Sequence, residues 1–483
     1  MTRFWGSVFR LDLRALALAR MAAGGFLFGD LLLRCRHAEV FYAGQGVTPR
    51  QLFLDQFVSW PFPTLHLAND SYPYQLGLLL LQAAAALLLA LGYRTRAVSV
   101  LCWLGLLSLH QRNPLVLNSG DALLLMLLFW GMFLPWGKRW SLDERAARRL
   151  PGEVPEVPGQ VSEGQGEGAE ERPDEVCSAA SVGWCLQMVC LYLFAALHKL
   201  NPVWLSDGNA VLFALKLSHH ATPFADWLTP YPDLLKALSR LVVTAELGLA
   251  LSLLAPWPRW RTVVLTGAAL MHLGFGLFLA IGIFRYAPLV GLLGLLPVGR
   301  LARWKRAEGP VAIDLRGGRS LALLAVSLLV WAVNLESLGR GQKLFLPPLL
   351  GQVAPLLVGP QSWGVFAGPG LEQSGWFALQ VQARDGRSYD AWWGDREFSD
   401  ERPERIAASY PDDRWRKYML NLAGLPPHHP YQERFVAWAA GAWDRRHGEN
   451  PAHGVSLWYV AQDTSPGGEF GPARWTLLAR FPQ

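Results

Sequence analysis

Two titratable side chains end a long apolar run in the stretch FAALHKLNPVW, residues 194–204. His198 and Lys199 stand side by side there, directly before an Asn-Pro break. A lysine at a helix end often only extends its amine to the membrane surface, and a histidine can bind the last carbonyl groups. Ala195 and Ala196, one turn earlier, leave space beside the lysine stem and favour a cavity. A lysine desolvated in a cavity can act as a base, so Lys199 is the first candidate catalytic residue and His198 is an alternative.

Ionisable residues inside apolar runs are costly and usually face the interior of a helix bundle. Arg20, Glu246 and His272 each lie near the middle of such a run. We predict a structural ion pair between Arg20 and Glu246, with Arg285 as the other possible partner, because an unpaired buried carboxylate is strongly destabilising. His272 could be a satisfied buried histidine, but it could also stabilise negative charge that develops in a reaction. We therefore count it as a candidate catalytic residue.

A set of polar residues is expected at the same outer helix ends as Lys199, where they could converge on one outward-facing cavity: Arg112, Asn118, Asp121, Asn201 and Arg285. Asp121 has a second interpretation, because a carboxylate at a helix N-terminus interacts favourably with the helix dipole. The predicted substrate-binding residues are Asn118, Asp121, Asn201, Trp204, Arg285 and Tyr286.

The composition indicates a membrane protein. The chain has 483 residues, of which 52% are hydrophobic, 22 are tryptophan, and the mean hydropathy is +0.19. A soluble protein of this length is much less apolar, and a membrane span needs about 20 apolar residues. About nine spans are predicted, at residues 12–34, 75–93, 97–112, 119–136, 178–199, 234–255, 262–283, 285–301 and 319–337.

Arginine and lysine collect in alternate loops between these runs, as in residues 94–96, 138–149, 259–261 and 300–319. The positive-inside rule makes these loops cytoplasmic. We therefore expect a multi-pass protein of a bacterial-type inner membrane, with a cytoplasmic N-terminus and an extracytoplasmic tail. The first run lacks a cleavage site and is predicted to be a true span. The net charge of +6 reflects the basic loops and indicates no nucleic-acid partner.

Four regions are predicted along the chain. Residues 1–149 form a four-span part, residues 150–176 a disordered acidic cytoplasmic linker rich in Pro, Gly and Glu, and residues 177–340 a five-span part. In residues 341–483, apolar and polar residues alternate around an Asp-Gly turn, as in a hairpin, and a helix-like pattern follows. This predicts a small α+β extracytoplasmic domain. The five cysteines form no CxxC motif, so no metal site is expected.

Four stretches over about residues 10–340 resemble the horizontally transferred transmembrane (HTTM) family, which includes the membrane part of vitamin K-dependent gamma-carboxylases. The stretches are LALARMAAGGFLFGDLLLRCRHAEVFYAGQGVTPR, HQRNPLVLNSGDALLLMLLFWGMFLPWGKRWSLD, LHKLNPVWLSDGNAV and AELGLALSLLAPWPRW with the following MHLGFGLFLAIGIFRYAPL.

The resemblance implies an enzyme that oxidises a reduced, vitamin K-like quinone with O2 to generate a strong base, which then allows CO2 to carboxylate a glutamate-like substrate. It places Lys199 on the lysine thought to deprotonate the quinone, in a KKLD-x-x-W-x-x-G stretch, with Trp204 near the matching tryptophan. It also places Glu246 on an acidic position and His272 on a histidine. The chain departs from the family where NSGD replaces an Asn-His pair and where His198 replaces the first lysine.

Two other functions stay open. The chain could be a non-carboxylating relative that binds quinol or lipid and modifies another substrate, including a periplasmic protein or peptide. It could also be a transporter or an assembly partner in the lipid bilayer, with Arg20, Glu246 and His272 as a proton or ion relay.

Overall fold

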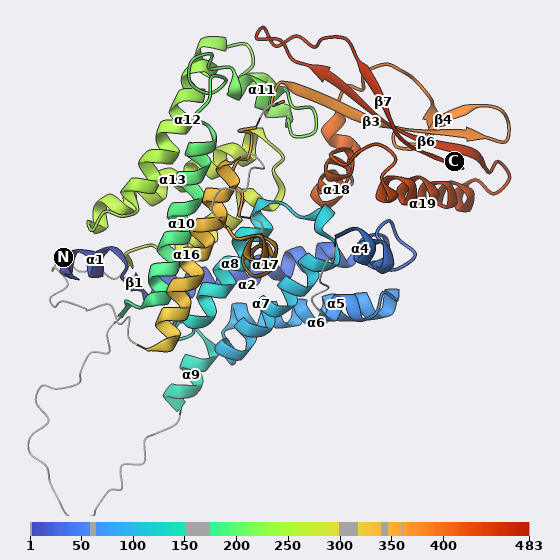
Figure 1. The fold of residues 1–483 in the computed structure, drawn as a ribbon. Coiled ribbons are helices and arrows are strands. Elements are labelled where there is room, and N and C mark those ends of the chain that lie inside the picture. The colour runs from blue at the N-terminus through green and yellow to red at the C-terminus, as the bar shows by residue number, and fades with distance from the viewer. Residues whose placement is uncertain are drawn as a thin grey trace, which may run out of the picture.

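The computed structural model describes residues 2–57, 64–149, 174–298, 317–339, 346–359, 361–368 and 370–482. Within these residues the chain is mostly helical, with a small sheet near the C-terminus (Figure 1). Five helices are long and apolar enough to cross a membrane: α2 (Leu13–Cys35), α6 (Tyr72–Leu91), α10 (Ala179–His198), α13 (Pro258–Phe278) and α16 (Gly318–Leu338). The chain is therefore a membrane protein with several apolar helices, and the predicted number of nine spans is not confirmed.

The other four predicted spans also contain helices, but these are shorter or more polar. They are α7 (Thr95–Arg112), α8 (Ser119–Phe133), α12 (Pro232–Ser252) and α14 (Ala287–Leu293). The predicted end of the eighth span and the basic loop after it lie mostly outside the described residues.

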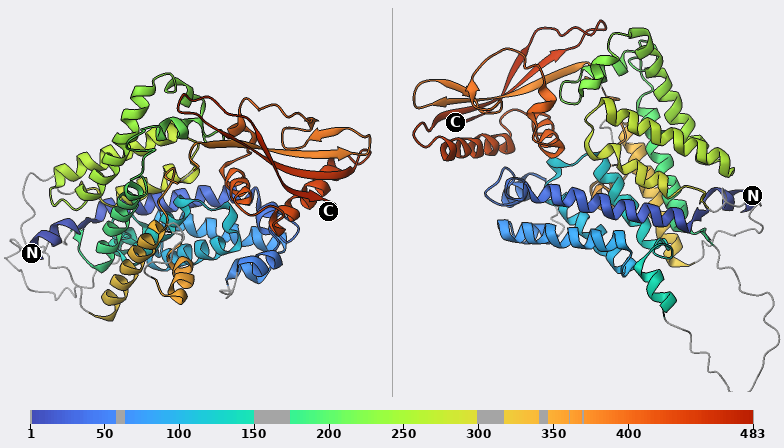
Figure 2. Two further views of the ribbon diagram at one scale, coloured as in Figure 1. Left: turned by 45° about the horizontal axis from the view of Figure 1, so that its top comes forward. Right: turned by 180° about the vertical axis from the view of Figure 1, so that it is seen from behind.

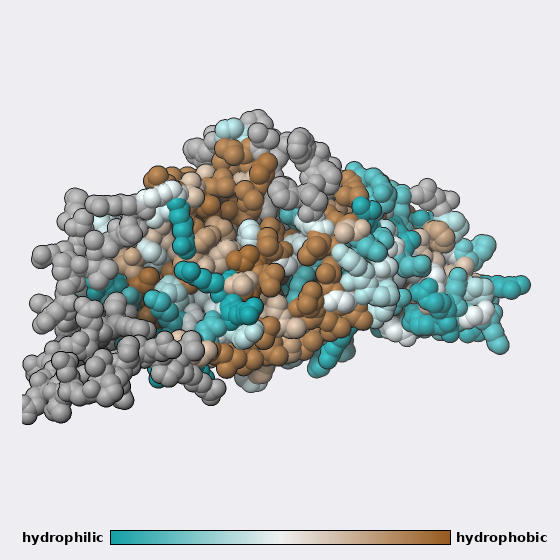
Figure 3. Space-filling model, turned by 90° about the horizontal axis from the view of Figure 1, so that it is seen from below, coloured by the Kyte–Doolittle hydropathy of each residue, from teal (hydrophilic) through white to brown (hydrophobic). Residues whose placement is uncertain are grey.

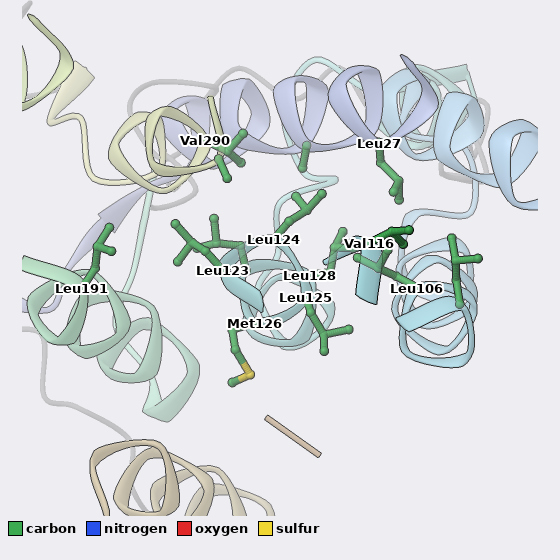
Figure 4. Close-up of a cluster of buried hydrophobic side chains, with 14 of the residues drawn as sticks. Leu27, Leu106, Val116, Leu123, Leu124, Leu125, Met126, Leu128, Leu191 and Val290 are labelled. Carbon is green, nitrogen blue, oxygen red and sulfur yellow. The ribbon is translucent and has the colours of Figure 1, made fainter. Parts of the chain in front are cut away.

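Helix α8 has 15 residues and lies at the centre of the bundle. Its side chains extend on all sides, toward Leu27, Leu106, Leu191 and Val290 (Figure 4). A helix that is apolar all round must be buried by its neighbours, so α8 is surrounded by protein. Seen from below, the described surface carries apolar side chains over the middle of the molecule, whereas hydrophilic ones gather at the end with the C-terminal sheet (Figure 3).

Small residues let the first helices pack closely. A Cβ atom added to Gly24 on α2 would lie 2.5 Å from the backbone nitrogen of Ala90 on α6, so only glycine allows this approach. Helix α2 begins where the Asp12 carboxylate accepts hydrogen bonds from the backbone N–H groups of Arg14 and Ala15. The short helices α3 (Ala38–Tyr42), α4 (Arg50–Phe57) and α5 (Leu65–Ala68) follow between α2 and α6.

Helix α10 is the central helix of the second half, and it begins with a capping box at Ser178 and Ser181. It packs against α8, α12, α14 and α16. Helix α11 (Ala210–Lys216) and the short helix η2 (Pro223–Trp227) connect α10 to α12, and η3 (Gly282–Arg285) connects α13 to α14. Helix α17 (Pro348–Val358) packs against α16, α7 and α8.

The C-terminal region forms the predicted α+β structure. Its five-stranded antiparallel sheet has the order β5-β4-β3-β6-β7, with β3 (Gln373–Ala383), β4 (Ser388–Asp390), β5 (Arg396–Glu397), β6 (Ala452–Asp463) and β7 (Arg474–Phe481). The predicted hairpin is β3–β4, which turns at Asp385 and Gly386. Helices α18 (Asp413–Ala423) and α19 (Pro430–Arg446) lie between the sheet and the helical bundle (Figure 1).

The N-terminal helix α1 (Thr2–Val8) and helix α9 (Leu142–Arg149) lie at the opposite end of the molecule from the sheet (Figures 1 and 2). Residues 150–173 of the predicted linker lie outside the described residues. The predicted boundary at residue 176 is too late, because β2 (Glu175–Val176) pairs with β1 (Leu11–Asp12). Asp174 and Glu175 also bind the arginines at positions 10, 14 and 139, and this charge pairing holds the last linker residues to the bundle.

Candidate functional site

A cavity of about 610 Å³ lies among α10, α11, α12 and α13. Its wall is formed mainly by leucine, valine, alanine and phenylalanine side chains from these helices, and the segment Trp363–Phe366 closes one side. A Cβ atom added to Gly248, Gly267 or Gly274 would meet no other atom within 4 Å, so these glycines border open space. Among the described residues that line the cavity, only Lys199 and Glu246 carry charge.

Lys199 and Glu246 form a buried ion pair in the cavity wall. The Lys199 Nζ donates hydrogen bonds to both Glu246 carboxylate oxygens, at 2.9 and 3.0 Å, and to the Ala195 carbonyl oxygen at 3.3 Å. The two side chains are only 5% and 6% exposed. Lys199 is the C-cap residue of α10, so its amine faces back over the last turn instead of extending to a surface. The snorkelling interpretation therefore does not describe Lys199.

The segment after Lys199 holds one end of the cavity together. Trp204 is 4% exposed, its ring lies 5.3 Å from the Lys199 Nζ, and its indole N–H donates to the Phe366 carbonyl oxygen at 3.0 Å. The Asn201 side chain donates to the carbonyl oxygens of His198 and Ala367, both at 3.2 Å. Trp204 is therefore part of the lining, whereas Asn201 ties the covering segment to the end of α10.

Tyr192 and His272 form a second polar pair beside the first. The Tyr192 hydroxyl lies 3.1 Å from the His272 Nε2, and both residues are buried. Tyr192 precedes Lys199 by two helical turns, so both point from the same face of α10. The Glu246 carboxylate interacts electrostatically with Tyr192, and the Lys199 ammonium group interacts electrostatically with His272. Three helices thus bring four functional groups together.

The structure corrects the predicted pair between Arg20 and Glu246. The Arg20 guanidinium donates to four backbone carbonyl oxygens, those of Leu89, Ala90, Trp136 and Trp140, at 2.6 to 3.0 Å. The Leu89 and Ala90 carbonyls lie in the last turn of α6, where helices leave acceptors unpaired, whereas Trp136 and Trp140 lie in the segment after α8. Glu246 is held by Lys199 and not by Arg20 or Arg285, so a relay through Arg20, Glu246 and His272 has no support in these contacts.

Asn118 and Asp121 belong to a different cluster, at the N-terminus of α8. Their side chains form a capping box, which agrees with the structural interpretation of Asp121. Asp121 also binds Arg34 at 2.7 Å and Arg414 at 2.7 and 2.9 Å.

Asp30 completes this cluster, which joins the C-terminal region to the bundle. It binds Arg34 at 2.7 Å and Arg414 at 2.6 Å. Burial alone would lower the pKa of Arg414, but the charges of Asp121 and Asp30 outweigh burial and raise it above its ordinary value. Two buried carboxylates therefore balance two buried guanidinium groups, one of which comes from α18.

Five predicted site residues near this region do not line the cavity: Asn201, His272, His198, Arg285 and Tyr286. The His198 Nε2 lies 3.0 Å from the Ser337 hydroxyl on α16. Arg285 donates to the Gly276 carbonyl oxygen at 3.4 Å and stacks on Tyr286, which is 41% exposed. His198 therefore faces another helix, Arg285 lies near Arg416 of the C-terminal region, and the Tyr286 ring contacts Phe26 on α2.

Several residues of these sites were missed in the sequence. Tyr192 could have been found from its spacing of seven residues before Lys199, and Asp30 and Arg34 from their i, i+4 spacing inside an apolar run. Arg414 offered no such signal, because it lies in a polar helix far along the chain. Within the described parts of the chain, no group of three histidine, cysteine or acidic residues is arranged to hold a metal ion.

Comparison with known proteins adds no family to these observations. No protein-family model, curated protein or solved structure matches the chain.

Proposed function

We propose that the chain is an integral membrane enzyme that binds a reduced quinone in the cavity and moves a proton through Lys199 and Glu246. One observation carries the proposal: the charged residues in the described lining of a large apolar cavity are one lysine and one glutamate bound to each other. Charged groups are costly in such surroundings and are typical of functional sites in membranes.

The cavity suits a ring compound with an apolar body and a hydroxyl group. Its volume of about 610 Å³ is in the range of small-molecule sites. Trp204, Phe275 and Phe284 offer aromatic surfaces for a ring, and Lys199 and Glu246 can hydrogen-bond a hydroxyl group. When bound, a reduced quinone would supply, together with O2, the strong base that a carboxylation with CO2 requires.

Glu246 determines whether Lys199 can act as a base. An ammonium group has no lone pair to accept a proton, and Lys199 donates to both Glu246 oxygens. Transfer of one proton from Lys199 to Glu246 leaves an amine and a carboxylic acid, both uncharged, which apolar surroundings tolerate. The amine can then accept the proton of a hydroxyl group in the cavity. The pair therefore takes up one proton in total, which ends on Glu246 while Lys199 is recharged.

Further parts of the proposal come from the resemblance and the charge pattern. They include membership of the HTTM family, carboxylation of a glutamate-like group on a periplasmic protein or peptide, and nine spans in a bacterial-type inner membrane with an extracytoplasmic tail. The lengths of α10, α13 and α16 support the membrane location. The separation of α9 from the sheet supports opposite sides for the basic loop and the tail.

A non-carboxylating enzyme that binds quinol or another lipid is the second candidate. The apolar lining favours this candidate as much as the carboxylating enzyme, because it selects a lipid-soluble ligand and does not determine which substrate is modified. The two candidates differ in whether CO2 is incorporated into a product.

Oxygen consumption by the purified protein in detergent, with menadiol as the reduced quinone, tests the proposal. We expect consumption above the rate without protein, and we expect Lys199→Arg and Lys199→Ala to abolish it, because a guanidinium group does not release its proton in this pH range. Lys236→Arg, an exposed lysine at the start of α12, is the matched control and should keep full activity.

Absence of consumption by the native protein, or full activity of Lys199→Arg, would contradict the proposal. Labelled CO2 offered with a glutamate-containing peptide then separates the two candidates, since only the carboxylating enzyme incorporates the label.

A further inference from the structure

A group of basic side chains lies where the C-terminal region meets the membrane helices. We call it the basic cluster, and its members are His219 and His220 in the loop after α11, Arg285 in η3, and Arg416 and Lys417 in α18. The Arg416 guanidinium donates to the His219 carbonyl oxygen at 3.5 Å, and the charge of Arg285 acts on Arg416. Residues from three separate parts of the chain thus meet at one place.

The acidic side chains near this place are already bound. Asp413 binds Arg416 and accepts a hydrogen bond from the Asn118 side chain at 3.1 Å. Asp412 binds His37 at 2.6 Å, and Asp121 binds Arg34 and Arg414. Asp121 also acts on Lys417 through its charge, but it is shared with Arg34 and Arg414, and no ion pair of Arg285 or Lys417 is seen among the described residues.

The surroundings are positive in potential. Burial and then the charges of Arg416 and Arg402 lower the pKa of His219 to about 3. Burial, and then the charge of Arg416, also lower the pKa of Lys417, and the opposing charge of Asp121 is too weak to prevent this. Burial, and then the charge of Arg416, also lower the pKa of His220, so both histidines are neutral near pH 7. Arg285, Arg416 and Lys417 bring three positive charges, against which stand Asp413 and the shared charge of Asp121.

Several donors in the basic cluster make no hydrogen bond within the described chain. They are the Nε atoms of Arg285 and Arg416. Two ring nitrogens, the Nε2 of His219 and the Nδ1 of His220, also make no hydrogen bond there. Arg416 is 6% exposed and His219 is 3% exposed. Buried polar groups are nearly always paired, so unpaired donors from several elements at one place suggest that a ligand supplies the acceptors.

The basic cluster adjoins the cavity. The His220 ring packs against the Phe366 ring with 5.4 Å between centroids, and Arg285 follows Phe284 directly; both phenylalanines line the cavity. A molecule bound in the basic cluster would therefore lie close to the end of the cavity nearest the C-terminal region.

We infer that the basic cluster binds an anionic oxygen group, a carboxylate or a phosphate, through Arg285, Arg416 and Lys417. Guanidinium and ammonium groups are the usual partners of such oxygens, and hydrogen bonds between charged groups are the strong ones. The anion would neutralise the excess charge and accept hydrogen bonds from the unpaired donors. This inference goes beyond the proposed reaction, and its test requires no turnover.

Thermal unfolding of the full chain in detergent tests the inference, with sodium phosphate, glutarate or phosphatidylglycerol added at a matched ionic strength of sodium chloride. We expect at least one anion to raise the Tm, because a ligand that binds the folded state stabilises it. Stabilisation by phosphate or glutarate would indicate a soluble ligand, and stabilisation by phosphatidylglycerol alone a lipid headgroup.

Lys417→Gln and Arg285→Gln each remove one charge and should weaken the apparent affinity about tenfold or more. Lys417→Gln should also raise the Tm without added anion, because it removes an unbalanced cation. Lys236→Gln removes an exposed charge outside the basic cluster and should leave the anion-induced shift unchanged. No shift in the native protein beyond that of chloride, or equal shifts in the native protein and in both cluster variants, would overturn the inference.

Discussion

Replacing Glu246 with leucine would leave the Lys199 ammonium group buried without its counterion. The pair is about 5% exposed, and after the substitution the Ala195 carbonyl oxygen, at 3.3 Å, is the acceptor that remains among the contacts seen. Breaking a buried pair from one side typically costs about 3–5 kcal/mol. The variant can instead bury a neutral amine, and removing a proton from an ordinary lysine costs about 4–5 kcal/mol at pH 7. Both routes predict a loss of similar size.

The loss of stability in Glu246→Leu should depend on pH. The sign of this dependence follows from whether folding releases a proton. If the variant folds with a neutral amine, folding releases a proton, so its stability rises with pH up to the ordinary lysine range. The cost of removing the proton falls to about 2 kcal/mol at pH 9. We therefore expect the difference in Tm between the native protein and Glu246→Leu, measured by tryptophan fluorescence in detergent, to shrink between pH 7 and pH 9.

Two double variants separate the observed pair from the pair predicted in the sequence. Lys199→Met in the Glu246→Leu background should recover most of the lost stability, because an apolar replacement of a whole buried pair is close to neutral. Arg20→Leu in the same background should add its own loss, since Arg20 binds backbone carbonyls of α6 and of the region after α8. Recovery with Arg20→Leu and not with Lys199→Met would refute the reasoning.

Three further predictions follow from the contacts and the charge pattern. Arg414→Gln should lower the free energy of unfolding by about 3–5 kcal/mol and make the C-terminal region more sensitive to limited proteolysis, because it leaves Asp30 and Asp121 with one arginine; the exposed Arg384→Gln should change neither. Burial would raise the pKa of Asp412, but the hydrogen bond from His37, together with those from the backbone N–H groups of Trp415 and Arg414, outweighs burial, and the pKa lies below its ordinary value. That contribution is present above about pH 4 and is lost as the pH falls through the lowered value, so the Tm values of His37→Gln and of the native protein should differ at pH 6 and converge at lower pH. A reporter that is active only in the periplasm should be active when fused after Gln483, and activity of a cytoplasmic reporter there would contradict the predicted topology.

Much of the fold could be predicted because it depends on local patterns. Each of the nine predicted apolar runs contains a helix in the described structure, since the length and hydropathy of a run decide whether it can be a buried helix. The Asp-Gly turn likewise predicted the β3–β4 hairpin, because the turn residues set the register of the strands. Helix α17 was missed, since Pro348 and Pro355 interrupt its sequence.

The candidate site was predictable only in part. The small residues before Lys199 indicated space beside its stem, and that space is part of the cavity. The sequence by itself therefore determined the membrane class, the helical segments and the unusual lysine at the end of α10. These properties follow from neighbouring residues along one chain segment.

Tertiary structure alone decided which charges meet. The sequence suggested Arg20 or Arg285 as the partner of Glu246, but the packing of α12 against α10 brings Lys199 to it. Asp121 is 293 residues from Arg414 along the chain, yet the docking of α18 brings them to 2.7 Å. The physical reason is that an ion pair depends on distance and orientation between helices, and hydropathy patterns contain neither quantity.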